Sequence, residues 1–135
     1  CNNKRCFYRD CFPAHFTGSA LLIDPETNSV LLNHHRGLNK WLQFGGHCDG
    51  NENILEVAYR EAIEESGISS LTLFSQSPID LDIHQIPANS KRQEPAHFHY
   101  DVRFIFLASQ KANYQISDEN GFLSTKPPNL TWIKI

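Results

Sequence analysis

A single amphipathic helix in an otherwise strand-patterned chain is the feature that most limits how this sequence can fold. Residues 51–67 carry the helical pattern, and Gly67 stands at a C-cap position. At about 100° per residue, Ile54, Val57 and Ala58 fall on one side of this helix and form an apolar stripe. The chain thus combines one central helix with segments of a different periodicity on both sides of it.

Those other segments alternate apolar and polar residues, which is the pattern of half-buried strands. The expected strands are residues 15–23, 29–35, 68–74, 79–84, 98–106 and 130–135, with a short segment at 41–44. A turn at 24–28 makes the first two a hairpin, and the turn-rich loop 87–95 allows 79–84 and 98–106 to pair antiparallel. Residues 1–14 are expected to form an irregular arm. Many strands around one helix indicate an α+β or layered α/β/α domain with a mixed sheet.

Length and composition set the broad class. At 135 residues the chain is expected to form a single domain, residues 1–135, and 40% hydrophobic with 20% charged residues argues against disorder. A net charge of −3 provides no basic surface for duplex nucleic acid or an anionic membrane. The apolar runs are too short to span a bilayer, and no secretory signal is evident, although the chain begins at Cys1 rather than Met. We therefore expect a soluble, cytoplasmic protein.

The four cysteines do not have the spacing of a metal site. Cys1, Cys6 and Cys11 lie in the N-terminal arm and Cys48 lies in a glycine-rich segment, without any Cys-x-x-Cys pair. Without a secretory context we expect reduced thiols. A disulfide among the N-terminal cysteines is the alternative for an exported protein.

Three glutamates continue the apolar stripe of the helix. Glu61, Glu64 and Glu65 share a narrow face with the apolar residues, one to two turns further along. Two like charges about 5 Å apart repel by roughly 3 kcal/mol at an effective dielectric of about 20. Either this face is a solvated acidic surface or the semi-buried carboxylates need a counter-charge. A hard divalent cation with oxygen ligands fits that need, and Mg²⁺ is commonly shared with substrate phosphates.

The residues near the glutamates favour phosphate chemistry. Gly45 and Gly46 form an expected loop in which the backbone can approach a ligand or a metal closely. Arg60 is either a fixed cation that orients Glu52 or Glu61, or an ordinary surface arginine. A phosphate-binding P-loop, a Gly-x-Ser-x-Gly elbow and a cysteine nucleophile motif are all missing from the sequence. Direct attack by a metal-activated water is the better fit.

These residues together resemble the Nudix box. Gly46, Glu52 and the run REAIEESGI at residues 60–68 match every fixed position of the pattern G, five residues, E, seven residues, REUxEExGU, where U is aliphatic. The family often has proline before the glycine pair, whereas Phe44 stands there in this chain. That difference removes no ligand. The resemblance implies an α/β/α sandwich with a mixed central sheet, in which residues 45–68 form a catalytic loop–helix–loop.

The resemblance also implies an activity: hydrolysis of a nucleoside diphosphate linked to another moiety, with Mg²⁺ or Mn²⁺. It implies Glu61, Glu64 and Glu65 as metal ligands, completed by a carbonyl of Gly45 or Gly46. Glu52 and Arg60 would hold the loop and the helix in register, with Gly67 ending the helix. The implied partner is a small nucleoside diphosphate derivative, not duplex nucleic acid or a membrane.

The box leaves the general base open. It is either Glu61 or a glutamate on a downstream loop, for which Glu119 is the candidate; an exposed loop acid is the alternative interpretation of Glu119. A Nudix-fold sensor that binds a nucleotide derivative without turnover is the alternative function. The intact box favours the enzyme.

Histidines are the remaining unusual feature. His97, His99, Asp101 and Arg103 share one face of a predicted strand, opposite polar residues of its expected neighbour, Asp80, Asp82 and His84. This face is a second metal site, a cradle for substrate phosphate or a solvated sheet face. Further candidates for contact with substrate, each with an ordinary packing or surface role as its alternative, are Lys91, Arg92, His34, His35, His47, Trp41 and Tyr100.

Overall fold

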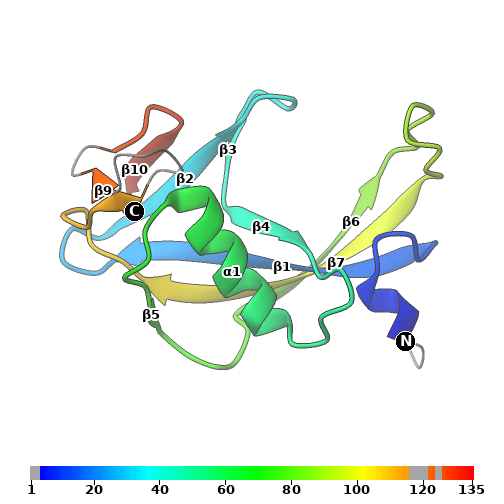
Figure 1. Cartoon of the computed structure of the whole chain (residues 1–135), viewed down its shortest axis with the longest axis horizontal. Coiled ribbons are helices and arrows are strands. Elements are labelled where there is room, and N and C mark those ends of the chain that lie inside the picture. Colours follow the sequence, from blue (N-terminus) through cyan, green and yellow to red (C-terminus); the bar gives the residue numbers. More distant parts are fainter. Residues whose placement is uncertain (1–3, 116–121, 124–125) are drawn as a thin grey trace.

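The fold is built around one mixed β-sheet (Figure 1). A computed structural model describes residues 4–115, 122–123 and 126–135. The strands are β1 (Ala14–Asp24), β2 (Ser29–His35), β3 (Lys40–Leu42), β4 (Phe44–His47), β5 (Thr72–Leu73), β6 (Asp80–Ile86), β7 (His97–Leu107), β8 (Tyr114–Gln115), β9 (Phe122–Leu123) and β10 (Leu130–Lys134). Two helical elements accompany them, the 3₁₀ helix η1 (Lys4–Phe7) and the α-helix α1 (Ile54–Ser66).

Strand β1 is the centre of the main sheet, in which the order is β10-β2-β1-β7-β5. Along one edge it pairs in parallel with β7, from Ala14 opposite Phe98 to Ile23 opposite Leu107. Along the other edge it pairs antiparallel, first with β4 and then with β2. Strands β3 and β6 extend β2 and β7 as hairpins, and Figure 1 shows these two hairpins diverging on either side of β4.

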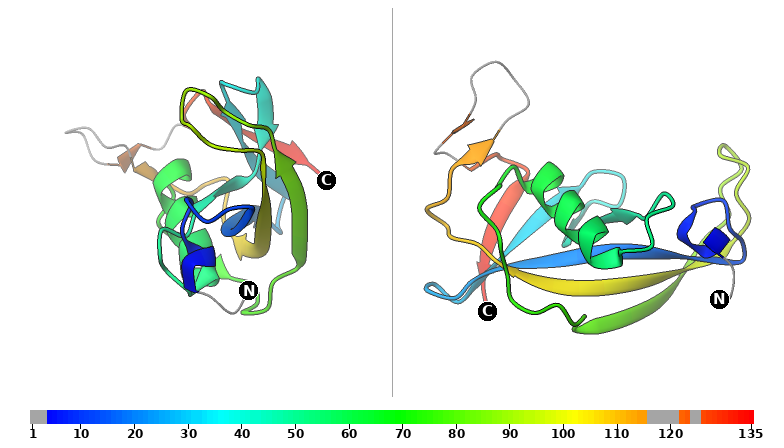
Figure 2. Two further views of the ribbon diagram at one scale, coloured as in Figure 1. Left: turned by 90° about the vertical axis from the view of Figure 1, so that its right-hand side faces the viewer. Right: turned by 60° about the horizontal axis from the view of Figure 1, so that its bottom comes forward.

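Helix α1 covers one face of this sheet (Figure 2). Asn53 caps its first turn by accepting a hydrogen bond from the Glu56 amide, and Gly67 ends it in the left-handed conformation at φ 75°. The predicted apolar stripe is confirmed, because Val57 and Ala58 are fully buried. They join a core whose sheet members include Ala20, Leu22, Phe44, Phe104 and Phe106. Since side chains alternate along a strand, the odd-numbered residues of β1 face away from the helix.

The predicted α+β class with a mixed sheet is confirmed, as are the β1–β2 hairpin and the antiparallel pairing of β6 with β7. Among the described residues the helical layer consists of α1 and the short η1. No helix in the described ranges has the length and apolar character needed to cross a bilayer. Of the cysteines, Cys11 and Cys48 are free thiols, as expected, while Cys1 lies outside the described residues.

Two predicted elements are wrong. Gly45 and Gly46 lie in strand β4 rather than in a loop, because this segment pairs with β1 so closely that a Cβ on Gly45 would stand 2.8 Å from the Gly18 carbonyl oxygen. The strand predicted at residues 68–74 is only β5, Thr72–Leu73. It is short because β5 pairs with β7 only at Leu107 and Phe106, while β6 pairs with residues 97–103 of β7.

The C-cap provides a first prediction. Replacing Gly67 with Ala should lower the free energy of unfolding by about 1–3 kcal/mol, because a Cβ at this positive φ is strained and would lie 2.6 Å from the Gln115 carbonyl oxygen. Urea denaturation followed by circular dichroism measures the loss. Gly37→Ala is the matched control, since its Cβ would meet only the movable ring of His35. Equal losses in the two variants would contradict the assignment.

Candidate active site

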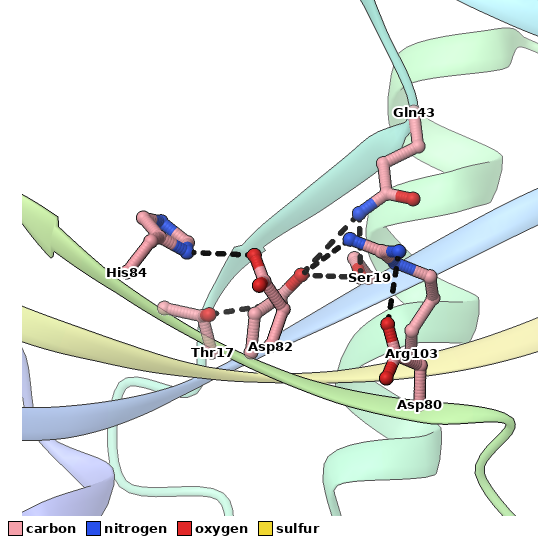
Figure 3. Close-up of polar contacts among 8 residues, drawn as sticks. Thr17, Ser19, Gln43, Asp80, Asp82, His84 and Arg103 are labelled. Atoms are coloured by element: carbon pink, nitrogen blue, oxygen red, sulfur yellow. Dashed lines mark hydrogen bonds and ion pairs between the residues drawn. The ribbon is translucent and has the colours of Figure 1, made fainter.

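A cavity of about 630 Å³ opens on the sheet face that points away from α1, between the β2–β3 and β6–β7 hairpins. Thr17 and Ser19 of β1 line it, whereas a Cβ on the intervening Gly18 would touch Ile54 and Val57 of the helix. Figure 3 shows the same separation, with the polar side chains in front of the strands and the helix behind. The remaining lining residues are Asn33, His35, Leu38, Lys40, Leu42, Gln43, Phe44, Gly45, Gly46, His47, Glu65, Asp82, His84, Ile86, His99, Asp101 and Arg103.

A buried carboxylate, Asp101, organises the floor of the cavity. Its two oxygens accept hydrogen bonds from the Thr17 hydroxyl at 2.9 Å and the Ser19 hydroxyl at 2.7 Å. The Gln43 amide donates to both Asp101 and Ser19, at 3.3 and 3.0 Å. Figure 3 shows Gln43 reaching down from the β3–β4 junction toward Ser19. This network fixes β1, β7 and the start of β4 relative to one another.

Arg103 brings a cation to the same floor. Its Nη1 lies 3.2 Å from an Asp80 carboxylate oxygen, and its Nη2 lies 4.0 Å from Asp101. Its Nε is buried and has no hydrogen-bond partner among the described residues. An unused buried donor beside a cavity suits an anionic or carbonyl oxygen of a ligand.

Two of the three box glutamates press against β4. The Gly45 amide donates to Glu65 Oε1 at 3.0 Å, and the Asn33 side-chain amide lies 3.5 Å from Glu65 Oε2. Glu61 stands against Gly46, where an added Cβ would come within 2.5 Å of the carboxylate carbon. Glu65 therefore lies where β2 and β4 separate, with Glu61 one turn earlier on the helix.

Glu64 does not share this burial, so the prediction of three inward-facing acids is wrong for that residue. Its side chain is exposed, and it lines a second cavity of about 470 Å³ between the end of α1 and the residues Gln115, Pro127 and Asn129. Residues 61 and 65 lie one helical turn apart and both face β4, whereas residue 64 lies to one side of them on the helix surface. Glu65 lines both cavities.

The environment of Glu65 favours its neutral form. The pKa of this carboxyl is raised to about 7, mainly by burial and also by the charges of Glu61 and Glu64, against the lowering effect of the Gly45 amide. Hard oxygen donors with excess negative charge are what a divalent cation of the Mg²⁺ class requires. The donor set of Glu61, Glu64 and Glu65 therefore fits the predicted ion.

Arg60 ties the helix to β4. Its Nη2 donates to Glu61 Oε1 at 3.2 Å and to the His47 carbonyl at 3.3 Å. Arg60 was expected to orient either Glu52 or Glu61, and in the structure it contacts Glu61. Glu52 instead lies on the exposed loop before α1, with Lys4 Nζ at 4.0 Å.

Histidines crowd the far end of the cavity. His15, His47 and His99 each offer a ring nitrogen, and these atoms lie within 4.8 Å of one another. His15 is 1% exposed, and its Nε2 has no partner in the described part of the chain. Leaving such a nitrogen unsatisfied costs about 1–3 kcal/mol. Burial is also the main cause that lowers the pKa of His47 to about 4 and of His99 to about 3, so both rings are neutral at pH 7.

The other predicted contacts divide into two groups. His84 stands opposite His99 and beside Asp82, as the strand pairing predicted. A fully solvated face is wrong for β7, because His97 is 3% and Asp101 is 7% exposed. Six candidates are not among the residues that line the main cavity: His34 and Trp41, which pack on each other; Lys91 and Arg92, on the turn after Asn89; His97; and Tyr100, which packs on Phe16. Glu119 lies outside the described residues.

Sequence reasoning missed His15 and the pair Thr17 and Ser19. Each is brought to the site only by the parallel register that sets β1 beside β7, with His15 opposite His99 and Thr17 opposite Asp101. A histidine near the start of a predicted strand was the one available signal.

Comparison with known proteins agrees with this fold. A family model described as NUDIX domain matches residues 14–132. A NUDIX family hydrolase from Clostridium perfringens has a similar structure, with a TM-score of 0.56 and 22% identity over 89% of this chain and 81% of that one. The dihydroneopterin triphosphate pyrophosphohydrolase of E. coli is similar with a TM-score of 0.54 and 14% identity, over 88% and 80% of the two chains.

At these identities the structural likeness concerns the fold. A comparison with curated protein sequences gives no significant match. The family model nevertheless spans most of the chain and includes the glutamates of α1. The chain therefore belongs to the Nudix family of hydrolases.

Proposed function

We propose that this protein hydrolyses the pyrophosphate bond of a nucleoside diphosphate linked to another moiety, with Mg²⁺ or Mn²⁺ bound by Glu61, Glu64 and Glu65. The observation that carries the proposal is the placement of Glu61 and Glu65 against the glycines of β4, at the edge of the main cavity. Membership of the family supports the reaction type.

The chain's own residues prepare the carboxylates for a cation. The Gly45 amide and the Asn33 side chain hold Glu65, and Arg60 holds Glu61, so that both carboxylates are oriented before any ion binds. The carbonyl groups of Gly45 and Gly46 are the additional oxygen donors of this region. When bound, Mg²⁺ or Mn²⁺ would neutralise the diphosphate and make a water molecule more acidic.

Glu61 is the general base that we favour among the described residues. In the proposed step the oxygen of water bonds to one phosphorus, the bridging P–O bond to the other phosphate breaks, and a carboxylate accepts the proton of the water. Glu61 is part-buried and held by Arg60, so its position is fixed for that transfer. Glu119 stays the alternative base on the downstream segment.

Arg103, His47, His99 and Asp101 are the candidate substrate-binding residues that reach the cavity. The unused Nε of Arg103 provides a donor for a phosphate or a base carbonyl. Trp41, Lys91, Arg92 and His97 do not line this cavity, so the proposal does not depend on them.

A substrate panel tests the reaction. Nucleoside diphosphates linked to a sugar, a second nucleoside or an alcohol should release a nucleoside monophosphate when Mg²⁺ or Mn²⁺ is present, and none after chelation. Chromatographic detection of both products measures turnover. Saturable binding without turnover on every compound would identify a sensor instead and would refute hydrolysis.

Removing one charge from the box should separate activity from folding. Glu65→Gln and Glu64→Gln should each lower kcat on the order of 10²–10³-fold, because an oriented metal ligand is lost. Glu56→Gln is the matched control, since it removes an exposed acid from the first turn of the same helix. Equal activity in all three variants would contradict the proposed ligand set.

The raised pKa of Glu65 predicts a pH effect in chelator-treated protein. Because the folded state holds this proton more tightly than the unfolded chain, stability is lost as pH rises from 4.5 to about 7, by up to about 3 kcal/mol. Glu65→Gln should be more stable than the wild type by this amount at pH 8 and equally stable near pH 4. Chemical denaturation at several pH values measures the difference. A constant difference across this range would contradict the assignment.

The glycine pair gives a contrast between function and stability. Gly46→Ala should displace the Glu61 carboxylate, which ends a flexible side chain, and so reduce kcat at least about 10-fold with little effect on unfolding. Gly45→Ala should instead destabilise the fold, because its Cβ would meet the backbone of Gly18 and Ser19. Assays of turnover and of thermal unfolding on both variants distinguish the two effects; a Gly46→Ala enzyme with full activity would argue against Glu61 in its proposed place.

A further inference from the structure

The histidine cluster is a donor set separate from the glutamates that bind the metal in the proposed hydrolysis. His15 of β1, His47 of β4 and His99 of β7 point to the same side of the sheet, because His99 stands opposite His15 and His47 stands opposite Thr17 in the strand register. Their ring nitrogens lie within 4.8 Å of one another. Three neighbouring strands thus direct three imidazoles to one point.

The hydrogen bonding of His15 prepares one of these rings to act as a ligand. Its Nδ1 lies 3.1 Å from the Cys11 carbonyl oxygen, which can only accept, so Nδ1 carries the proton. The lone pair is therefore on Nε2, the buried atom without a partner among the described residues. A backbone carbonyl that fixes the tautomer of a histidine is the usual support for a metal-binding imidazole.

The surroundings keep the cluster rigid on one side and open on the other. The ring of His97 stacks on His15 with centroids 5.0 Å apart, and Phe12 packs edge-on against His97 at 5.1 Å. His47 and His99 line the main cavity, so a ligand position opposite His15 faces open space. Binding of one ion brings tetrahedral nitrogen ligands to about 3.3 Å from one another, which requires small rotations of the two cavity-facing rings.

The donor chemistry selects the type of ion. Three neutral imidazoles without a carboxylate among them suit Zn²⁺ and similar transition metals, whereas Mg²⁺ and Ca²⁺ require oxygen ligands. A phosphate group is a poorer fit, because the lone pair of His15 Nε2 would face its negative oxygens. Asp82, which pairs with His84, lies on the next strand, where the ring centroids of His84 and His99 are 5.4 Å apart.

We propose that His15, His47 and His99 form a transition-metal site for an ion of the Zn²⁺ class, separate from the glutamate site and with one coordination position open to the cavity. The site lies on the cavity face of the sheet, while Glu61 lies against the helix face of β4. An ion bound there would place a positive charge next to the cavity floor, where it can bind an anionic oxygen or a water molecule.

Metal binding to the whole chain tests the proposal without any activity assay. Protein stripped with a chelator is titrated with Co²⁺ and, separately, with Zn²⁺, in saturating Mg²⁺ to occupy the glutamates. We expect about one equivalent of Co²⁺ to give the intense visible absorption of a four-coordinate site. His99→Asn and His47→Asn should each weaken Zn²⁺ binding by at least about 100-fold in calorimetry. Both rings are only part-buried, so these variants are expected to fold, which circular dichroism checks.

Two variants serve as controls. His34→Asn removes a histidine that packs on Trp41 outside the cluster, and Glu65→Gln removes a ligand of the proposed Mg²⁺ site. Both should keep the Co²⁺ spectrum and the Zn²⁺ affinity of the wild type. Unchanged Zn²⁺ binding in His99→Asn and His47→Asn, loss of binding in Glu65→Gln, or the weak absorption of six-coordinate Co²⁺ in the wild type would each overturn the proposal.

Discussion

The close approach of α1 to strands β1 and β4 is the contact on which the carboxylate site depends. Gly18 and Gly46 leave the space for it: an added Cβ on Gly18 would stand 3.0 Å from the Ile54 carbonyl oxygen, and one on Gly46 would meet Glu61. Burial of Val57 and Ala58 holds the helix in this position, at roughly 1.5–3 kcal/mol for a large aliphatic side chain. That apolar contact offsets the cost of gathering carboxylates at the end of the same stripe, and it explains why the acids follow directly after the apolar residues.

Strand β1 contributes side chains to both faces of the sheet, the face covered by α1 and the face that carries the cavity. Its even positions pack on α1, whereas its odd positions place Thr17 and Ser19 in the cavity and the buried His15 in the adjoining histidine cluster. Because side chains alternate with a period of two, a shift of one residue in the β1–β7 register would move Asp101 away from Thr17 and His99 away from His15. The hydrogen bonds from Thr17 and Ser19 to the buried Asp101 favour the observed register. The same pairing thus sets the cavity floor and the histidine cluster together.

The parts of this protein that the sequence predicted are those determined by neighbours in the chain. The helix, its end at Gly67 and the common face of Glu61 and Glu65 follow from a period of 3.6 residues. The β6–β7 pairing follows from two alternating segments joined by a turn. His15 was missed because its partner is His99, and no local pattern encodes a parallel pairing between strands so distant. The exposure of Glu64 was missed because burial depends on what packs beside the helix, not on the angle of a residue around it.

Charge around the cavity links the two donor sets. Its lining contains the acids Glu65, Asp82 and Asp101 and the bases Lys40 and Arg103, while His47 and His99 are neutral at pH 7. Asp101 is engaged by two hydroxyls, which leaves the charges of Lys40 and Arg103 against those of Glu65 and Asp82. This balance of charge does not attract a diphosphate. Favourable binding of such an anion therefore requires added positive charge at the cavity. Two different bound ions can supply this positive charge, one held by the glutamate oxygens of the helix and one by the histidine nitrogens of the strands. Different ions are involved because hard and borderline cations select different ligands. Alternation along β4 separates Glu61 from the histidines, since Gly46 faces the helix beside Glu61 and His47, the next residue, faces the cavity.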